Sequence, residues 1–286
     1  MKKVFILGNP RSGTTLLRIM LNSHPDIIAA PESGFMQWWY KKYATWSYKD
    51  ALNSKKIHDF VGDVFSSKKI ENWELDRDEI IQLIHNVKPD NYGDLCELFY
   101  ISRAKIFKKT PKVIIDKNNY YIHHLETINK IWPNAYYLHL IRDGRDVACS
   151  YMAIKSLKTS SIYKPQLFDH IEDIAKEWKE NNLKIEKYLN KNVKDKYLTI
   201  KYEDLVLDTE KQLIQITDLL EVNYRKVMLE YYKYNDEPKS TLDWKKNTLK
   251  KPDKNNIGKY KYTLSRKEIE KFDYIAKTLL SKYNYV

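Results

Sequence analysis

The sequence has little of what marks several common classes of protein. Only two cysteines, Cys96 and Cys149, occur among its 286 residues, and their spacing suits neither a disulfide framework nor a zinc site. No apolar run reaches the roughly 18 residues that a membrane-spanning helix needs. The apolar run near the N-terminus ends at Gly8, too early for a signal peptide. We therefore expect a soluble, cytoplasmic protein with two buried thiols and no transmembrane segment.

Acidic residues are outnumbered. The chain has 50 lysines and arginines against 38 aspartates and glutamates, a formal net charge of +12. A positive surface attracts an anionic cofactor, an acidic substrate or nucleic acid, and charge alone does not choose among them. No zinc finger or aromatic-stacking motif is present, so we expect no nucleic-acid partner. The length is sufficient for one substantial core, and we interpret residues 1–286 as a single domain.

A lysine is missing from the most informative segment. Val4–Arg18 is typical of a strand, a glycine-bounded loop and a helix, the arrangement that directs backbone N–H groups at a phosphate. Gly8 and Gly13 enclose four residues as in a Walker A loop, but Thr14 stands where a nucleotide triphosphatase carries its lysine. Arg11 supplies a planar guanidinium inside the loop, which suits a tetrahedral oxyanion. The loop therefore predicts a phosphate-like ligand other than ATP.

Strand and helix patterns alternate along the chain. Five apolar runs predict buried parallel strands at Val4–Leu7, Ile27–Ala30, Val113–Ile115, Tyr136–Ile141 and Tyr197–Ile200. Helical periodicity predicts helices over Thr14–Leu21, Tyr121–Ile131, Asp146–Lys155, Asp169–Leu189, Thr209–Leu220 and Ser265–Ser281. This alternation indicates an α/β fold, a P-loop-like parallel sheet flanked by helices. Residues 38–112 lack strand signals and predict a helical insertion.

Polar residues follow every predicted strand. Ligands of open α/β sheets bind beyond the carboxyl ends of the strands, so these residues are the candidates for a site. Beyond the loop after the first strand, they are Glu32 after the second strand, Asp116 and Lys117 after the third, Arg142 after the fourth and Tyr202 after the fifth. We expect these side chains to converge on the phosphate loop.

The motifs resemble those of the sulfotransferases that use 3′-phosphoadenosine 5′-phosphosulfate (PAPS), and most closely the arginine-loop branch, which includes carbohydrate and tyrosylprotein sulfotransferases. Gly8–Arg18, followed by His24-Pro25, resembles the 5′-phosphosulfate loop of that family. Tyr137–Val147 with Ser150 resembles its 3′-phosphate segment. Lys201–Leu205 and Ile257–Tyr260 resemble two later landmarks, in the same order and with similar spacing.

The resemblance implies in-line, metal-free transfer of a sulfonyl group from PAPS to an acceptor hydroxyl, with 3′,5′-adenosine bisphosphate (PAP) as product. The residues that it implies for the 5′-phosphosulfate are Arg11, Ser12, Gly13, Thr14 and Thr15. Arg142 and Ser150 would bind the 3′-phosphate, Tyr202 the adenine end, and Lys259 would close over the cofactor. Glu32 would take the acceptor's proton, while Arg11 and Lys117 stabilise the sulfonyl charge. His24 is a second candidate for the base.

Two departures from the family bear on the acceptor. Tyrosylprotein sulfotransferases carry an arginine two residues after the base, where this chain has Gly34, and Asn118 follows Lys117 where the family often has proline. We therefore expect a carbohydrate, a glycolipid or lipid-linked glycan, or a small metabolite as acceptor, with the insertion on the acceptor side. Aromatic residues of the insertion either contact this acceptor or pack in the core. They are Trp38, Trp39, Tyr40 and Trp46.

A P-loop kinase or nucleotide triphosphatase is the alternative interpretation. Val113–Asp116 has the form of a Walker B strand end, and such an enzyme would need Asp116 and Thr15 to share a magnesium ion. The missing loop lysine counts against this alternative. A sulfonyl group carries less charge than a phosphoryl group, so arginine, lysine and N–H donors can stabilise its transfer without a metal.

Overall fold

The computed structural model describes residues 1–286 and is organised around one five-stranded parallel sheet. The strands are β1 (Lys2–Leu7), β2 (Ile27–Ala29), β3 (Val113–Lys117), β4 (Tyr136–Ile141) and β5 (Tyr197–Lys201), in the order β2-β3-β1-β4-β5. All five strands were predicted. β1 begins two residues before Val4, and β3 runs two residues past Ile115, so that Lys117 is the last residue of a strand.

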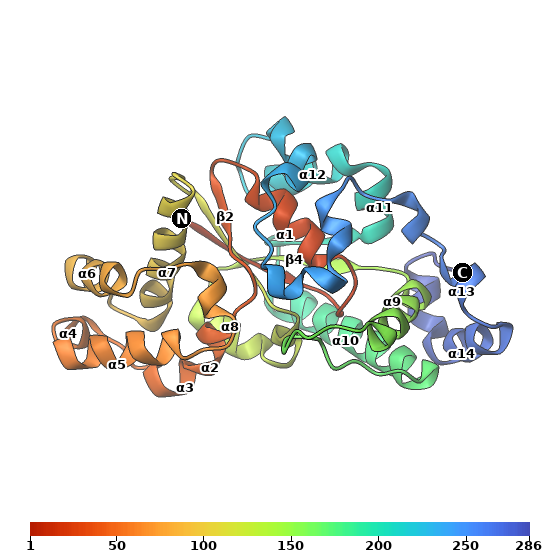
Figure 1. Cartoon of the computed structure of the whole chain (residues 1–286), viewed down its shortest axis with the longest axis horizontal. Helices are drawn as coiled ribbons and strands as arrows, with labels where there is room; N and C mark the ends of the chain where they lie inside the picture. Colours follow the sequence, from red (N-terminus) through yellow and green to blue (C-terminus); the bar gives the residue numbers. More distant parts are fainter.

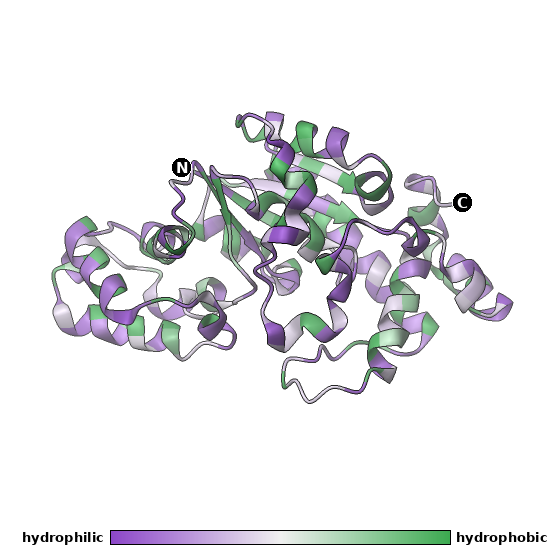
Figure 2. Ribbon diagram, turned by 45° about the horizontal axis from the view of Figure 1, so that its top comes forward, coloured by the Kyte–Doolittle hydropathy of each residue, from purple (hydrophilic) through white to green (hydrophobic).

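The two faces of the sheet pack into separate cores because successive strand residues point to opposite sides. Val4 and Ile6 of β1 pack with α1 (Thr14–Asn22), α11 (Tyr202–Leu207) and α12 (Thr209–Leu219). Phe5 and Leu7 pack with α7 (Tyr92–Ile106) and α8 (Leu125–Ile131). Figure 2 shows the central strands as mostly hydrophobic segments, with hydrophilic positions on the outer helices. This is the predicted P-loop-like α/β architecture.

A third core lies beyond β4 and β5. It joins α9 (Gly144–Ser156), α10 (Ile171–Asn192) and α14 (Arg266–Lys282). The ends of α1, α9, α10, α12 and α14 lie within three residues of the predicted ends. The predicted helix Tyr121–Ile131 is interrupted at His124, whose φ of −133° and ψ of 29° separate a 3₁₀ helix (Asn119–His123) from α8. The short helix α11 was missed, although Glu203 and Asp204 mark its first turn.

The insertion is helical, as predicted, and its helices begin at Phe35. It contains α2 (Phe35–Trp38), α3 (Tyr40–Tyr43), α4 (Tyr48–Ala51), α5 (Ser54–Phe65), a 3₁₀ helix (Ile70–Trp73), α6 (Arg77–Val87) and α7. In Figure 1 these orange and yellow helices lie at one side of the molecule, and α9, α13 (Tyr260–Thr263) and α14 lie at the other. The sheet and its phosphate loop therefore lie between two helical regions.

A C-terminal segment of short helices connects α12 with α13. It contains 3₁₀ helices at Lys226–Tyr234, Lys239–Trp244, Lys246–Leu249 and Lys254–Asn256. We call residues 235–256 the strap, because residues from this range line the cleft described below. No helix combines the length and the apolar composition required to cross a membrane. Cys96 and Cys149 are free and buried, as predicted.

Candidate active site

The loop between β1 and α1 depends on its two glycines. A Cβ at Gly8 would lie 2.5 Å from the carbonyl oxygen of Leu140, and one at Gly13 would lie 2.5 Å from the ring of Tyr202. Gly13 also has a φ of 96°, in the left-handed region that favours glycine. No side chain caps the N-terminus of α1. The first amides of α1 therefore have no intrahelical acceptor and are available to an anion in the cleft.

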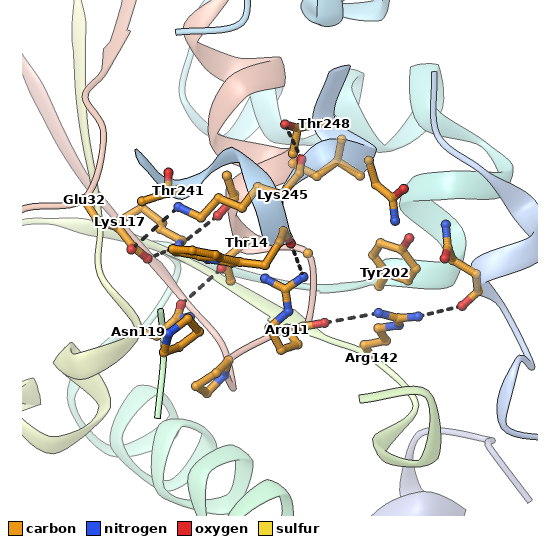
Figure 3. Close-up of a pocket in the computed structure, with 18 of the residues that line it drawn as sticks. Arg11, Thr14, Glu32, Lys117, Asn119, Arg142, Tyr202, Thr241, Lys245 and Thr248 are labelled. Atoms are coloured by element: carbon orange, nitrogen blue, oxygen red, sulfur yellow. Dashed lines mark hydrogen bonds and ion pairs between the residues drawn. The ribbon is translucent and has the colours of Figure 1, made fainter. Parts of the chain in front are cut away.

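A carboxylate and a lysine meet beside this loop (Figure 3). The amine of Lys117, at the end of β3, forms an ion pair with Glu32 Oε1 and donates a hydrogen bond to Thr15 Oγ1 at 3.2 Å. Thr14 Oγ1 donates to Asn119 Oδ1 at 3.1 Å. The predicted catalytic pair and the threonines of the loop are thus in one cleft, at the carboxyl edge of the sheet.

Two further lysines reach Glu32, and the sequence interpretation missed both. Lys69 Nζ lies 3.2 Å from Glu32 Oε2, and Lys245 Nζ lies 3.9 Å from the same oxygen. Lys69 comes from the insertion and Lys245 from the strap. Lysine-rich composition hides both positions, since nothing in the sequence separates them from the many other lysines.

The three lysines set the charge state of the carboxylate. Burial alone would raise the pKa of Glu32, but Lys117, Lys245 and Lys69 outweigh burial and hold that pKa well below its ordinary value. Burial also lowers the pKa of Lys117, to about 8, against the opposing effect of Glu32. Glu32 is therefore ionised at neutral pH and able to accept a proton, and its basicity is limited by its neighbours.

A second cavity adjoins the cleft and brings together the residues predicted for the 3′-phosphate. Arg11, Arg142, Ser150 and Lys259 all line it. Arg11 Nε donates to Ser150 Oγ at 3.1 Å, and Arg142 Nη1 donates to the carbonyl oxygen of Arg11 at 3.2 Å. The guanidinium of Arg142 lies over the ring of Tyr202, 4.4 Å from its centroid (Figure 3). Tyr202 thus positions the arginine as well as lining the cleft.

The two arginines shared by these cavities are suited to an anionic ligand. Nε of Arg142 is buried without a hydrogen-bond partner. Arg11 also donates to the carbonyl oxygen of Trp244, and Arg142 to that of Asn256, both in the strap. Burial and the nearby Arg142 lower the pKa of Arg11 to about 10, so a phosphate or sulfonate would relieve the repulsion between the two guanidinium groups.

Two carboxylates that the sequence interpretation did not select hold the strap and the following loop in place. Asp146 of α9 accepts hydrogen bonds from the amides of Gly258 and Tyr260, at 2.8 and 2.9 Å. These contacts fix the backbone on both sides of Lys259. Glu237 pairs with Lys245 and with Arg18 of α1, whose Nη2 lies 2.8 Å from Glu237 Oε2. Glu237 thereby links the strap to α1, the helix that follows the phosphate loop.

Of the residues that the resemblance implies for donor binding, Ser12 is the one that lines neither cavity. Its hydroxyl is buried without a partner, and its amide donates to the carbonyl oxygen of Asn9 at 3.1 Å. The loop turns tightly at this point, so the side chain of Ser12 points into the protein. The loop donors available in the cleft come from Gly13, Thr14 and Thr15.

Asp116 and His24 do not enter the cleft either. Asp116 precedes Lys117 in β3, so its side chain is on the opposite face, where Tyr121 donates to it at 2.5 Å. The contact that the magnesium alternative needs, between Asp116 and Thr15, is therefore not formed. His24 is buried between the carbonyl of Asn223 and the amide of Asp26, at 2.8 and 3.0 Å. It has a structural role.

The aromatic residues of the insertion pack rather than line the cleft. Trp46 is buried and donates to the carbonyl of Pro89 at 3.2 Å, and Trp39 donates to Ser67 Oγ at 2.9 Å. Trp38 covers Gly34, where a Cβ would lie 2.4 Å from the indole. An arginine at position 34, where tyrosylprotein sulfotransferases carry one, would therefore require Trp38 to move.

A parallel sheet whose first strand leads through a glycine-bounded loop into an uncapped helix defines a P-loop-like nucleotide-binding fold. A family model described as the sulfotransferase family matches residues 3–226. The chain belongs to the sulfotransferase family, and it is therefore an enzyme that transfers sulfate.

Sequence relatives agree with this assignment. The chain is 26% identical over 231 residues to a putative protein-tyrosine sulfotransferase of Caenorhabditis briggsae, covering 80% of this chain and 69% of the relative. It is 24% identical over 243 residues to the protein-tyrosine sulfotransferase of Drosophila melanogaster, covering 83% of this chain but only 42% of the relative.

The fold is similar to that of the sulfotransferase domain from the Synechococcus PCC 7002 olefin synthase. The TM-score is 0.65 at 22% identity, over 98% of this chain and 94% of that domain. It is also similar to mouse sulfotransferase SULT7A1 complexed with PAP, with a TM-score of 0.51 at 14% identity, over 96% and 83% of the two chains.

Proposed function

We propose that this enzyme moves a sulfonyl group from PAPS to a hydroxyl of a carbohydrate, a glycolipid or a small metabolite. The observation that carries the proposal is the pair of adjoining cavities that share Arg11 and Arg142. One lies at the N-terminus of α1, and the other contains Ser150 and Lys259. Two anion sites joined in this way match the two phosphorylated ends of one adenosine nucleotide.

The residues divide the work of binding by position. Amides at the start of α1, the hydroxyls of Thr14 and Thr15, and Arg11 would hold the 5′-phosphosulfate. Arg142, Ser150 and Lys259 would hold the 3′-phosphate, with Asp146 keeping the backbone around Lys259 in place. The ring of Tyr202 supports Arg142 and borders the space for the adenine end. The likeness to a solved sulfotransferase complexed with PAP supports this choice of nucleotide.

The chemistry would take place between Thr15 and Glu32. When bound, the donor supplies an activated sulfonyl group whose leaving group is a phosphate. Glu32 would accept the proton of the acceptor hydroxyl while the new oxygen–sulfur bond forms and the bond from sulfur to the phosphate oxygen breaks. Lys117, which already contacts both Glu32 and Thr15, would stabilise negative charge on the sulfonyl and bridging oxygens, together with Arg11. The side chains provide these roles without a metal ion.

The residues near Glu32 bear on the class of acceptor. Gly34 stands where tyrosylprotein sulfotransferases carry an arginine suited to acidic peptides, and Trp38 covers this position, which favours an acceptor other than protein tyrosine. Although the curated relatives are named as protein-tyrosine sulfotransferases, the chain covers less than half of the Drosophila protein, so this activity does not transfer with the likeness. The cytoplasmic location stays a prediction from the sequence.

Thermal unfolding with nucleotides tests the proposal. A ligand that binds only the folded state raises the melting temperature, so PAP should give a larger shift than ATP with magnesium. Adenosine 5′-phosphate, which lacks the 3′-phosphate, is the matched control and should give a smaller shift. A larger shift with ATP and magnesium, or transfer activity abolished by EDTA, would favour the kinase alternative.

A further inference from the structure

Lys69 differs from the other two lysines that surround Glu32. The side chain of Lys117 is 2% exposed and is held by Thr15, and that of Lys245 is 7% exposed and is held by Glu237. Lys69 is 27% exposed, and its one carboxylate contact is Glu32, at 3.2 Å. Among these three cations, Lys69 is therefore the one that a molecule entering from solvent can reach and move.

The backbone at Lys69 is in a costly conformation. Its φ is 69°, in the left-handed region, which a residue with a side chain adopts only when the surrounding structure enforces it. Seven residues other than glycine have a positive φ, and only Arg11 and Lys69 among them line the cleft. At both positions the unusual backbone directs a cation toward the site. Strain of this kind is typical of ligand-binding positions.

Aromatic and apolar side chains form part of the lining of the cleft that Lys69 also lines. Its amine lies 5.7 Å from the ring centroid of Tyr163, whose hydroxyl donates to Glu71. Pro165, Leu167 and Trp244 also line this cleft. Aromatic and apolar walls suit the face of a sugar or an aryl ring, and a cation at their edge suits a negative group on that ring.

We propose that Lys69 binds an anionic group carried by the acceptor beside its reacting hydroxyl, and that this contact draws the Lys69 amine away from Glu32. The acceptor is then an acidic one, such as a carboxylated or already sulfated ring. The inference rests on the proposed function, because it takes Glu32 as the group that removes the acceptor's proton.

The contact has a consequence for the base. Glu32 is held as a weak base by three cations, and each cation that leaves it raises its pKa. The sulfonyl group would engage Lys117, and the anion of the acceptor would engage Lys69. Glu32 becomes a stronger base only when both substrates are bound, which protects the donor from attack by water. As Glu32 is neutralised by the proton, the new sulfate ester supplies the negative charge that the lysines need.

A pair of ring compounds that differ only in charge tests the inference. The probes are 3-hydroxybenzoate and 3-hydroxybenzamide, used as acceptors with PAPS. We expect kcat/KM to favour the benzoate by about tenfold, the effect of one charge-assisted hydrogen bond. Lys69→Met should remove most of that preference, and Lys69→Arg should restore it. Lys68→Met, at an exposed neighbouring position that lines neither cavity, is the matched control and should leave the preference unchanged.

If neither probe is turned over, binding measurements test whether Lys69 binds the anionic group of the acceptor. Calorimetric titration of both probes, with and without PAP, should give tighter binding of the benzoate to the wild type than to Lys69→Met. Equal affinity of the two probes, no detectable binding of the benzoate, or a preference that survives Lys69→Met would overturn the inference. Failure of the proposed function is distinct, since it would appear as absent PAP binding in every variant, including the Lys68→Met control.

Discussion

After the proposed substrates, we call the part of the cleft at the phosphate loop, with Lys117 and Arg142, the donor half, and the part around Lys69 and Lys245 the acceptor half. The two halves are built by different means. The donor half depends mainly on the main chain. Gly13 is left-handed, the first amides of α1 are free, and the ends of β3 and β4 position Lys117 and Arg142. In the acceptor half, long side chains from distant segments meet, among them Lys69 of the insertion and Lys245 of the strap. A phosphate can be bound by a backbone that many sequences share, whereas an acceptor is recognised by side chains that can change independently.

Glu32 lies where the two halves meet, and its removal should have the largest effect. Glu32→Gln keeps the shape of the side chain but cannot take a proton, so kcat should fall by roughly 10²-fold or more. PAP affinity, measured by calorimetry, should change little because the donor half does not depend on this carboxylate. Glu230→Gln, at an exposed position that pairs only with Lys233, is the control. Unchanged turnover in Glu32→Gln would remove Glu32 as the base.

Arg142 tests whether the donor half has two anion sites. Arg142→Ala should weaken PAP binding by about 10- to 100-fold, the effect of losing a charged hydrogen-bond donor. Binding of adenosine 5′-phosphate should fall much less, because that nucleotide has no 3′-phosphate. Arg142 also contacts the carbonyl of Arg11, so the substitution alters the loop and weakens both nucleotides to some extent. The ratio of their two dissociation constants, compared between wild type and variant, isolates the contribution of the 3′-phosphate. Equal losses for both nucleotides would contradict the assignment of the second cavity.

Glu237 connects the halves, because it pairs with Arg18 of α1 and with Lys245 of the strap. Burial would raise its pKa, but Lys245 and Arg18 lower it from 4.5 to about 2. A pKa that is depressed in the folded state stabilises the protein above the ordinary value, and the benefit is lost as the pH falls through the folded value. This depression corresponds to about 3 kcal/mol of stability at neutral pH.

Glu237→Gln should therefore lower the free energy of unfolding by about 3 kcal/mol at pH 7, measured by urea denaturation. The gap between wild type and variant should narrow as the pH falls from 4.5 toward 2, because wild-type Glu237 is protonated over that window. A gap that stays constant with pH would mean that lost packing, rather than lost charge, destabilises the variant. Glu230→Gln again serves as the control, since that carboxylate is exposed.

The same division explains how much the sequence could predict. The strands, the loop and the positions of Glu32, Lys117 and Arg142 followed from hydrophobic runs and from what comes after each strand. Lys69 and Lys245 could not be found in this way, because their roles depend on tertiary contacts among many lysines. Ser12 was predicted as a donor because of its motif, and its side chain points inward because the loop turns between Asn9 and Ser12. Asp116 and Lys117 were both expected at the phosphate loop. Because both lie in β3, where successive side chains point to opposite faces, only Lys117 reaches the cleft.

The smallest expected effect concerns the aromatic residues of the insertion. Trp38 is 41% exposed and lies over Gly34, two residues from Glu32, so its sequence position makes it a candidate acceptor contact. Because Trp38 lines neither cavity, Trp38→Ala should remove no contact with either substrate and should change kcat/KM for any acceptor by no more than about twofold. Lys69→Met should by contrast alter the preference between charged and neutral acceptors. A loss of tenfold or more in Trp38→Ala with unchanged PAP affinity would place acceptor recognition in the insertion's aromatic residues, and the comparison of the two halves would have to be redrawn around them.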